Sequence, residues 1–373
     1  MSYGVLSTYP PTQCGLATFS QALVNSLQST TDHVGVVRVL DSSEICSVGD
    51  HPWVRDRAGG AEAAAAALNA YDVAIIQHEY GIFPGPDGDE VLAVARALRV
   101  PTITVLHTVL VTPSPHQRAI LEELAQQSSV LVTMTGTARQ RLIDNYNVDP
   151  TIIQVIPHGA APRQATLPAR RPADHPPMIL TWGLLGVGKG IEWAISAMAQ
   201  LTDLQPLPQY WVVGQTHPKV IAHQGEAYRD RLIELAEHDA TGMVHFDDRY
   251  LTTPELHQLV EQADIVLLPY DSREQVTSGV LIEAVTAGKP VISTGFPHAV
   301  ELLSSGAGLI VERQNPTSIA DAVRRVLSEP GLAASMRAEA NRIAPDLLWP
   351  AVADRYRQVA FAITRSNAEL ASA

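Results

Sequence analysis

The sequence predicts an α/β protein made of two Rossmann-like domains, each built around a doubly wound parallel sheet. Two observations support this fold class. Short apolar, β-branched runs alternate with longer stretches of helical periodicity. The alternation stops at a proline-rich segment and then starts again. The length of 373 residues fits two or three domains of roughly 100–200 residues each.

The first half of the chain contains four runs that we predict to be buried parallel strands, each ending in polar or turn residues. They are residues 71–79, 100–108, 128–135 and 151–159, with helical patterns at 88–99, 116–127 and 136–146. A strand, a proline-bearing loop and an amphipathic helix occupy residues 7–24, with Gly15 at the turn. We therefore expect residues 1–160 to form the first domain.

The proline-rich segment is expected to be a linker. Residues 161–177 contain five prolines and show no periodicity. The alternation resumes with predicted strands at 178–183, 209–215, 243–248, 264–270 and 290–295, separated by helical patterns. This predicts a second domain over residues 178–349. The helical tail 350–373 is too short to have a core of its own.

Composition excludes several classes of protein. The formal net charge of −13 argues against a nucleic-acid binder and against a basic membrane-docking face. Two cysteines, Cys14 and Cys46, cannot build a disulfide framework or a four-cysteine zinc site. The first residues lack a basic, apolar signal sequence, and no apolar run reaches the roughly 18 residues of a spanning helix. We therefore expect a reduced, cytoplasmic protein without a transmembrane segment.

The strongest candidate site is the segment 264–294, because ligands of open parallel sheets bind beyond the carboxyl ends of the strands. A buried strand leads through a polar loop into a helix that opens at Thr277, Ser278 and Gly279. Free N–H groups at such a helix start attract anions. Glu283 lies on the apolar helix that follows, where a carboxylate needs a donor. That donor is either a sugar or ribose hydroxyl, or a structural arginine or backbone N–H.

A second glycine loop lies between a predicted strand and helix at residues 181–195. Gly183, Gly188 and Lys189 fit the pattern G-x-x-x-x-G-K, which holds phosphates in nucleotidases. Lys189 is informative because only three of the 26 basic residues are lysines. Gly190 stands where a Ser or Thr hydroxyl would hold magnesium. The loop therefore indicates a phosphate site without that metal ligand.

Two features of the first domain also lie at predicted strand ends. The turn at Gly15 indicates a close approach to a ligand, and it lacks G-x-G-x-x-G, which argues against a nicotinamide dinucleotide. His78 and His107 end neighbouring strands. We expect both histidines to point into one crevice.

These motifs together resemble the retaining nucleotide-sugar glycosyltransferases of family 4, over essentially the whole chain. The segments that carry the resemblance are STYPPTQCGLATF, QHEYGIF, TVLHT, VIPHG, LLGVGKGIEWAI, VVGQTHP and REQVTSGVLIEAVTAGKPVIS. The sequence looks most like the bacterial mannosyltransferase-like branch. The resemblance implies the GT-B fold, in which two Rossmann-like domains face each other across a cleft, with the helix after Trp349 crossing back onto the first domain.

The resemblance also implies roles for individual residues. Lys189 would be the phosphate lysine, and Glu283 would bind the ribose hydroxyls. The amides around Ser278, Gly279 and Val280, next to Thr277, would hold the diphosphate. In the first domain, His107 would lie near the donor sugar and Gly15 would face the diphosphate.

Two departures from the family pattern leave alternatives open. The first glutamate of the E-x7-E motif is replaced by Gln275, with Glu274 one residue before it. Either Gln275 contacts the sugar, or the loop shifts so that Glu274 does. The usual phosphate arginine is Leu184 here, and Arg273 is a candidate to replace it.

The resemblance implies an enzyme that transfers a hexosyl group with retention of configuration, without a metal or a cofactor. GDP-mannose is the favoured donor and UDP-glucose the next, with the base, guanine or uracil, held near Tyr250 and Leu251. The acceptor would be a carbohydrate, a glycolipid or a small molecule. The alternatives are a non-catalytic nucleotide-sugar-binding or partner subunit, a nucleotide-sugar epimerase, and a P-loop-like nucleotidase.

Overall fold

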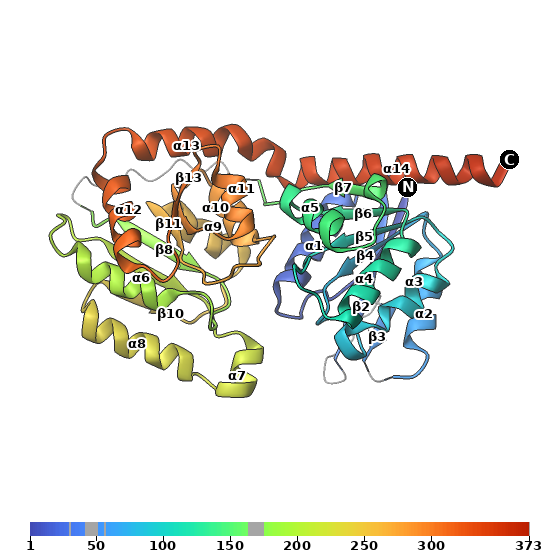
Figure 1. The fold of residues 1–373 in the computed structure, drawn as a ribbon, viewed down its shortest axis with the longest axis horizontal. Coiled ribbons are helices and arrows are strands. Elements are labelled where there is room, and N and C mark those ends of the chain that lie inside the picture. Colours follow the sequence, from blue (N-terminus) through green and yellow to red (C-terminus); the bar gives the residue numbers. More distant parts are fainter. Residues whose placement is uncertain (30, 42–50, 56, 163–174, 373) are drawn as a thin grey trace. The chain divides into compact units, whose positions relative to one another are not determined.

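A computed structural model describes residues 1–29, 31–41, 51–55, 57–162 and 175–372 of the chain. The chain divides into two compact units (Figure 1). Unit 1 consists of Met1–Ala161 and Leu347–Ala373, and unit 2 of Pro162–Asp346. Each unit contains one parallel sheet, which confirms the predicted fold class. Most of the predicted linker 161–177 lies outside the described residues.

The described residues of unit 1 form a seven-stranded sheet in the order β3-β2-β1-β4-β5-β6-β7. Its strands are β1 (Ser2–Ser7), β2 (His33–Leu40), β3 (His51–Val54), β4 (Val73–His78), β5 (Thr102–Leu106), β6 (Val130–Thr133) and β7 (Ile153–Val155). Its helices are α1 (Gly15–Leu27), α2 (Gly60–Leu68), α3 (Val91–Ala97), α4 (Pro115–Gln127), α5 (Gly136–Asn145) and α14 (Trp349–Ser372). The strand order reverses between β1 and β4, so the crevice of this sheet lies at their carboxyl ends.

Helices cover both faces of this sheet. Alternate residues of each strand point to opposite faces, and the two sets of residues pack against different helices. Val5 and Ile75 belong to one buried cluster with residues of α1 and α14. Leu6 and Ile76, their neighbours in sequence, belong to another cluster with residues of α2, α3 and α4. Burial on both faces explains the continuous apolar runs of the strands.

The described residues of unit 2 form a six-stranded sheet in the order β10-β9-β8-β11-β12-β13. Its strands are β8 (Met178–Trp182), β9 (Gln209–Val213), β10 (Val244–Asp247), β11 (Ile265–Leu268), β12 (Val291–Thr294) and β13 (Gly308–Val311). Its helices are α6 (Ile191–Met198), α7 (Pro218–Gln224), α8 (Ala227–Asp239), α9 (Thr253–Gln262), α10 (Gly279–Thr286), α11 (Pro297–Leu303), α12 (Pro316–Ser328) and α13 (Leu332–Ile343). Here the strand order reverses between β8 and β11, which places a second crevice beyond these two strands.

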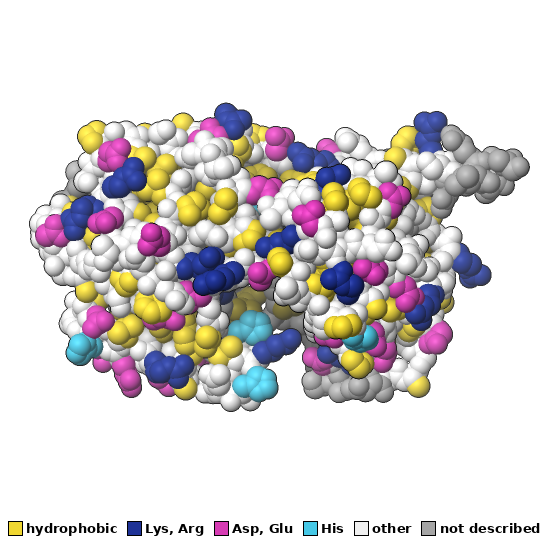
Figure 2. All heavy atoms as spheres, viewed as in Figure 1, with side chains coloured by type: hydrophobic (Ala, Val, Ile, Leu, Met, Phe, Trp, Pro, Cys, Tyr) yellow, Lys and Arg dark blue, Asp and Glu magenta, His cyan; other side chains and the backbone are white. Residues whose placement is uncertain are grey.

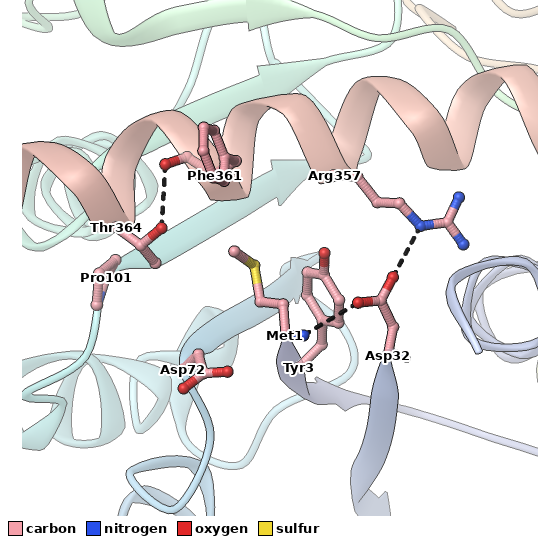
Figure 3. A pocket seen from close by; sticks show the side chains of 8 residues that line it. All are labelled: Met1, Tyr3, Asp32, Asp72, Pro101, Arg357, Phe361 and Thr364. Carbon is pink, nitrogen blue, oxygen red and sulfur yellow. Dashed lines mark hydrogen bonds and ion pairs between the residues drawn. The ribbon is translucent and has the colours of Figure 1, made fainter. Parts of the chain in front are cut away.

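A pocket of about 690 Å³ lies in unit 1 at the amino-terminal end of its sheet (Figure 3). It is lined by Met1, Tyr3, Asp32, Asp72, Pro101, Arg357, Phe361 and Thr364. Asp32 accepts from the amino group of Met1 and from Arg357 Nε, both at 3.1 Å. The Arg357 ion pair joins α14 to the end of the sheet opposite the crevice, so the pocket belongs to the attachment of this helix.

Replacing Trp349 by alanine is expected to destabilise unit 1 by about 3–5 kcal/mol, the usual cost of removing a buried aromatic ring. Trp349 is 6% exposed, and its ring centroid lies 5.0 Å from that of Phe19. The matched control is Phe361→Ala on the same helix, because Phe361 is 57% exposed. Denaturant unfolding checks this expectation. Equal shifts for the two variants would contradict it.

Candidate functional site

Two loops of unit 2 are held together at the point where the strand order reverses. The loop after β8 contains Gly188, and the loop after β11 contains Asp271, whose backbone N–H donates to the Gly188 carbonyl at 2.9 Å. Gly190 has φ +64°, and a Cβ there would lie 1.9 Å from the carbonyl oxygen of Pro269. A Ser or Thr cannot replace Gly190 in this loop. The magnesium hydroxyl of a P-loop nucleotidase therefore has no room here.

Lys189 is held over an aromatic ring at this junction. Its Nζ lies 4.3 Å from the centroid of the Tyr270 ring, a cation–π contact. Tyr270 is buried and stacks on Phe296 with centroids 5.5 Å apart. The stack fixes the ammonium group beside the loops. The sequence did not reveal this role of Tyr270, which follows the predicted strand as an ordinary aromatic residue.

The start of α10 presents free backbone donors. Ser278 is the N-cap, and its Oγ accepts from the Leu281 N–H at 3.3 Å. The N–H group of Ser278 donates to His298 Nδ1 at 2.8 Å. Within the described chain, no acceptor receives the N–H groups of Gly279 and Val280. The amide donors that remain for an anion are therefore those of Gly279 and Val280, rather than all three that the resemblance implied.

Glu283 lies on α10 beside a tryptophan from the neighbouring loop. The indole N–H of Trp182 donates to Glu283 Oε2 at 3.3 Å. Burial raises the pKa of Glu283 to about 7, and the Trp182 hydrogen bond opposes part of that rise. The carboxyl group is thus partly protonated near neutral pH. Two added hydroxyl donors, such as those of a ribose, would stabilise its charged form.

The loop before α10 distinguishes Gln275 from its neighbours. The side chain of Gln275 is partly buried, and its Nε2 donates to the Thr277 carbonyl at 3.0 Å, while its backbone N–H donates to Ser272 Oγ at 3.2 Å. Arg273 and Glu274 are exposed. The hydroxyl of Thr277 is buried and has no partner within the described chain.

Lys219 adds a further positive charge near the Lys189 loop, where it acts on His217. Leu185 of that loop pairs with Thr216 of the segment after β9, and the His217 N–H donates to the Leu185 carbonyl at 2.8 Å. The pKa of His217 is lowered by burial and then by the charges of Lys219 and Lys189. Two of the three lysines therefore act on one histidine at this edge of the sheet. The rarity of lysine was the signal that could have identified Lys219.

The residues expected to contact the base lie farther along the same edge. Tyr250 and Leu251 follow β10, the terminal strand of the sheet, which is separated from β8 by β9. Tyr250 is 45% exposed. Its ring is therefore accessible to a ligand.

Unit 1 brings Gly15 and His107 to the crevice of its own sheet. Gly15 opens α1, and a Cβ there would meet no atom within 4 Å. One turn later, the ring of Phe19 lies 4.8 Å from the ring of His107. Burial, followed by the charges of His158 and His78, lowers the pKa of His107 well below its usual value. Neutral His107 donates from Nε2 to Gln77 Oε1 at 2.7 Å, which leaves Nδ1 as the acceptor of the ring.

His78, which was expected to point into the same crevice, lies among aromatic rings of unit 1. It is completely buried, and its ring lies 4.9 Å from Tyr80 and 6.5 Å from Phe83. Burial lowers its pKa to about 4. His78 is the last residue of β4, and neither of its ring nitrogens has a hydrogen-bond partner within the described chain.

The described residues contain no group of three or more His, Cys, Asp or Glu side chains that could hold a metal ion. In the same part of the chain, every helix is too short or too polar to cross a membrane.

On the face drawn in Figure 2, Lys and Arg side chains are interspersed with Asp and Glu. That face therefore shows mixed charge rather than a basic surface.

Comparison with protein families matches both halves of the chain to glycosyltransferases. Residues 31–164 match the model described as Glycosyltransferase Family 4, and residues 163–343 match Glycosyl transferases group 1. The glycogen synthase of Mycobacterium tuberculosis is 28% identical over 74% of this chain and 66% of its own length. A D-inositol 3-phosphate glycosyltransferase of Kineococcus radiotolerans is 29% identical over 66% of this chain and 60% of its own length. The chain thus spans about two thirds or less of the length of each of these relatives.

Solved structures share the fold over nearly the whole chain. Anabaena Alr3699/HepE in complex with UDP and glucose has a TM-score of 0.74 at 16% identity, covering 96% of this chain and 99% of that one. Sucrose-phosphate synthase from Thermosynechococcus elongatus has a TM-score of 0.73 at 17% identity, covering 98% of this chain and 100% of that one. At these identities the likeness establishes the fold alone.

Glu283→Gln is expected to stabilise unit 2 relative to the natural chain more at pH 8 than at pH 5. The pKa of Glu283 rises from 4.5 to about 7 on folding, so the unfolded chain loses this proton first as the pH rises. The free energy of unfolding of the natural chain therefore falls between about pH 4.5 and 7. The Glu283→Gln variant avoids this fall because glutamine cannot ionise. Thermal unfolding of both proteins at the two pH values checks this. A difference that does not change with pH would contradict it.

Proposed function

This chain belongs to glycosyltransferase family 4, and we propose that it moves a hexosyl group from a nucleotide diphospho-sugar to an acceptor hydroxyl. The observation that carries the proposal is the set of groups at the carboxyl end of the unit 2 sheet. There, two loops joined by backbone contacts hold a lysine, two free helix amides and a carboxyl group. These are the groups that a diphosphate and a ribose require.

The diphosphate binds at the start of α10 in this proposal. The N–H groups of Gly279 and Val280 donate to its oxygens, aided by the helix dipole. Lys189 supplies a positive charge from the neighbouring loop, and Tyr270 keeps its ammonium group in place. With Leu184 in place of the usual arginine, Lys219 or the exposed Arg273 supplies further charge.

The ribose binds at Glu283. Its two hydroxyl groups donate to the carboxylate, and the indole of Trp182 holds one carboxylate oxygen from the other side. Because these donors favour the ionised form, binding lowers the pKa of Glu283 and releases a proton below about pH 7. The base lies toward Tyr250 and Leu251.

The transfer proceeds with retention of configuration and without a metal in this proposal. As the glycosyl centre becomes oxocarbenium-like, negative charge grows on the leaving diphosphate. Lys189 and the two helix amides stabilise that charge. Such electrostatic stabilisation of the transition state is usually the largest single contribution to catalysis. The acceptor hydroxyl attacks from the same face, and a leaving phosphate oxygen takes its proton.

In this proposal His107 lies near the donor sugar and Gly15 faces the diphosphate. His107 presents Nδ1 as an acceptor, because its Nε2–H donates to Gln77, and the ring is neutral at physiological pH. It can therefore receive a hydrogen bond from a sugar hydroxyl but carries no positive charge. Gly15 keeps the start of α1 open, because no side chain occupies that position.

Two donors are to be compared. The sequence resemblance favours GDP-mannose. The HepE structures hold UDP with glucose, or UDP-glucose itself, and glycogen synthase is among the relatives. UDP-glucose is therefore the second donor to test. The acceptor is a carbohydrate, a glycolipid or a small molecule.

A non-catalytic nucleotide-sugar-binding subunit is the second candidate. Leu184 and Gln275 favour it, because each replaces a charged residue of the family motif. Donor binding without release of the nucleoside diphosphate, across a broad panel of acceptors, would support this alternative.

Lys189→Met is expected to reduce the thermal stabilisation given by UDP-glucose or GDP-mannose in the presence of EDTA. A donor at a hundredfold excess over its Kd stabilises the folded protein by about 2.7 kcal/mol, and loss of the phosphate cation removes most of this. The matched control is Lys289→Met. Lys289 Nζ donates to the carbonyls of Glu261 and Ala263 at 2.7 and 2.9 Å, away from the proposed diphosphate. Equal loss in both variants, each measured from its own unliganded midpoint, would contradict the assignment.

Gln275→Ala is expected to lower kcat about a hundredfold, whereas Glu274→Ala changes it by less than about threefold. Gln275 is partly buried and held by Thr277, while Glu274 is exposed. Steady-state kinetics with the donor that binds check this. A large loss confined to Glu274→Ala would show that the loop shifts to bring Glu274 to the sugar.

A further inference from the structure

His298 contacts the loop of the proposed diphosphate site at two points. Its Nδ1 accepts from the backbone N–H of Ser278 at 2.8 Å, and its own backbone N–H donates to the Gln275 carbonyl at 3.4 Å. His298 is the second residue of α11 and is 3% exposed, and Ser278 is 4% exposed. The histidine thus closes a buried bridge between α11 and the segment that leads into α10.

The orientation of three successive amides depends on this bridge. Ser278 is extended, with φ −144° and ψ 109°, and helical geometry begins at Gly279. The Ser278 N–H points into the protein toward His298, and the next two N–H groups have no acceptor in the described chain. A buried N–H group without an acceptor is costly. Loss of the acceptor would therefore favour rotation of this peptide and of the peptides that follow it.

The acceptor atom also defines the state of the ring. Nδ1 can accept a hydrogen bond only when it carries no proton, so a neutral ring has its proton on Nε2. A side chain that replaces histidine must offer an acceptor at the position of Nδ1. Asparagine does so, since its Oδ1 lies the same number of bonds from Cα. The amide group of glutamine lies one bond farther out.

We infer that His298 is a positioning residue for the donor site, which fixes the Ser278 peptide so that the amides of Gly279 and Val280 are directed at the diphosphate. This inference rests on the proposed function, because it assigns a role within the same site. His298 itself does not touch the nucleotide sugar. It acts through the backbone of the loop.

The test compares His298→Asn, His298→Leu and His298→Gln by isothermal titration with UDP-glucose and with GDP-mannose. We expect His298→Asn to bind within about threefold of the natural chain. Both other variants are expected to bind about tenfold or more weakly, the usual effect of losing one well-placed hydrogen bond. If His298→Leu does not fold, His298→Gln carries the comparison, because it keeps a polar side chain of similar size.

Each outcome separates this inference from the proposed function. Binding by the natural chain and by His298→Asn, with weakened binding by His298→Gln and His298→Leu, supports the inference. Equal affinity in all variants overturns it, and so does equal loss in all three, which would mean that only the imidazole ring packs correctly. If the natural chain binds neither nucleotide sugar, the proposed function fails first.

Discussion

The contact between the β8 and β11 loops is the constraint on which the rest of the site depends. The Asp271 N–H donates to the Gly188 carbonyl at 2.9 Å, and Gly190 lies so close to Pro269 that no side chain fits there. Because β8 and β11 are parallel neighbours in the sheet, these two loops begin side by side at its carboxyl end. Their contact sets Lys189 over the ring of Tyr270, in the segment that leads from β11 to α10. Gly190 lacks the hydroxyl group that would hold magnesium in a nucleotidase. It is also the residue that lets the two loops meet.

Several side chains orient other groups rather than bind a ligand themselves. Tyr270 lies under Lys189, Trp182 holds Glu283, and Gln77 fixes the proton of His107 on Nε2. Each acts on a group whose direction or charge decides what it can bind. This arrangement offers one way for the chain to tolerate leucine at position 184. A single lysine and two amides act more strongly on a diphosphate when buried neighbours hold them in place.

The fold could be predicted from the sequence because buried parallel strands are short apolar runs between helical patterns. This held for β4, β5 and β8. It failed for β2, where Arg38 interrupts the apolar run although its side chain is fully buried, and for β13, which has only four residues. The site was predictable where chemistry is local, as at Lys189. The partners of Glu283 and Ser278 were not, because Trp182 and His298 are 101 and 20 residues away in the chain.

A crystal structure of the protein grown with UDP-glucose or GDP-mannose is the decisive test of the proposed donor site, since it locates every part of the donor at once. We expect the diphosphate within hydrogen-bond distance of the Gly279 and Val280 amides and of Lys189 Nζ, with the ribose hydroxyls on Glu283. A nucleotide sugar bound elsewhere on the chain, or a diphosphate that leaves these two amides without a partner, would contradict it.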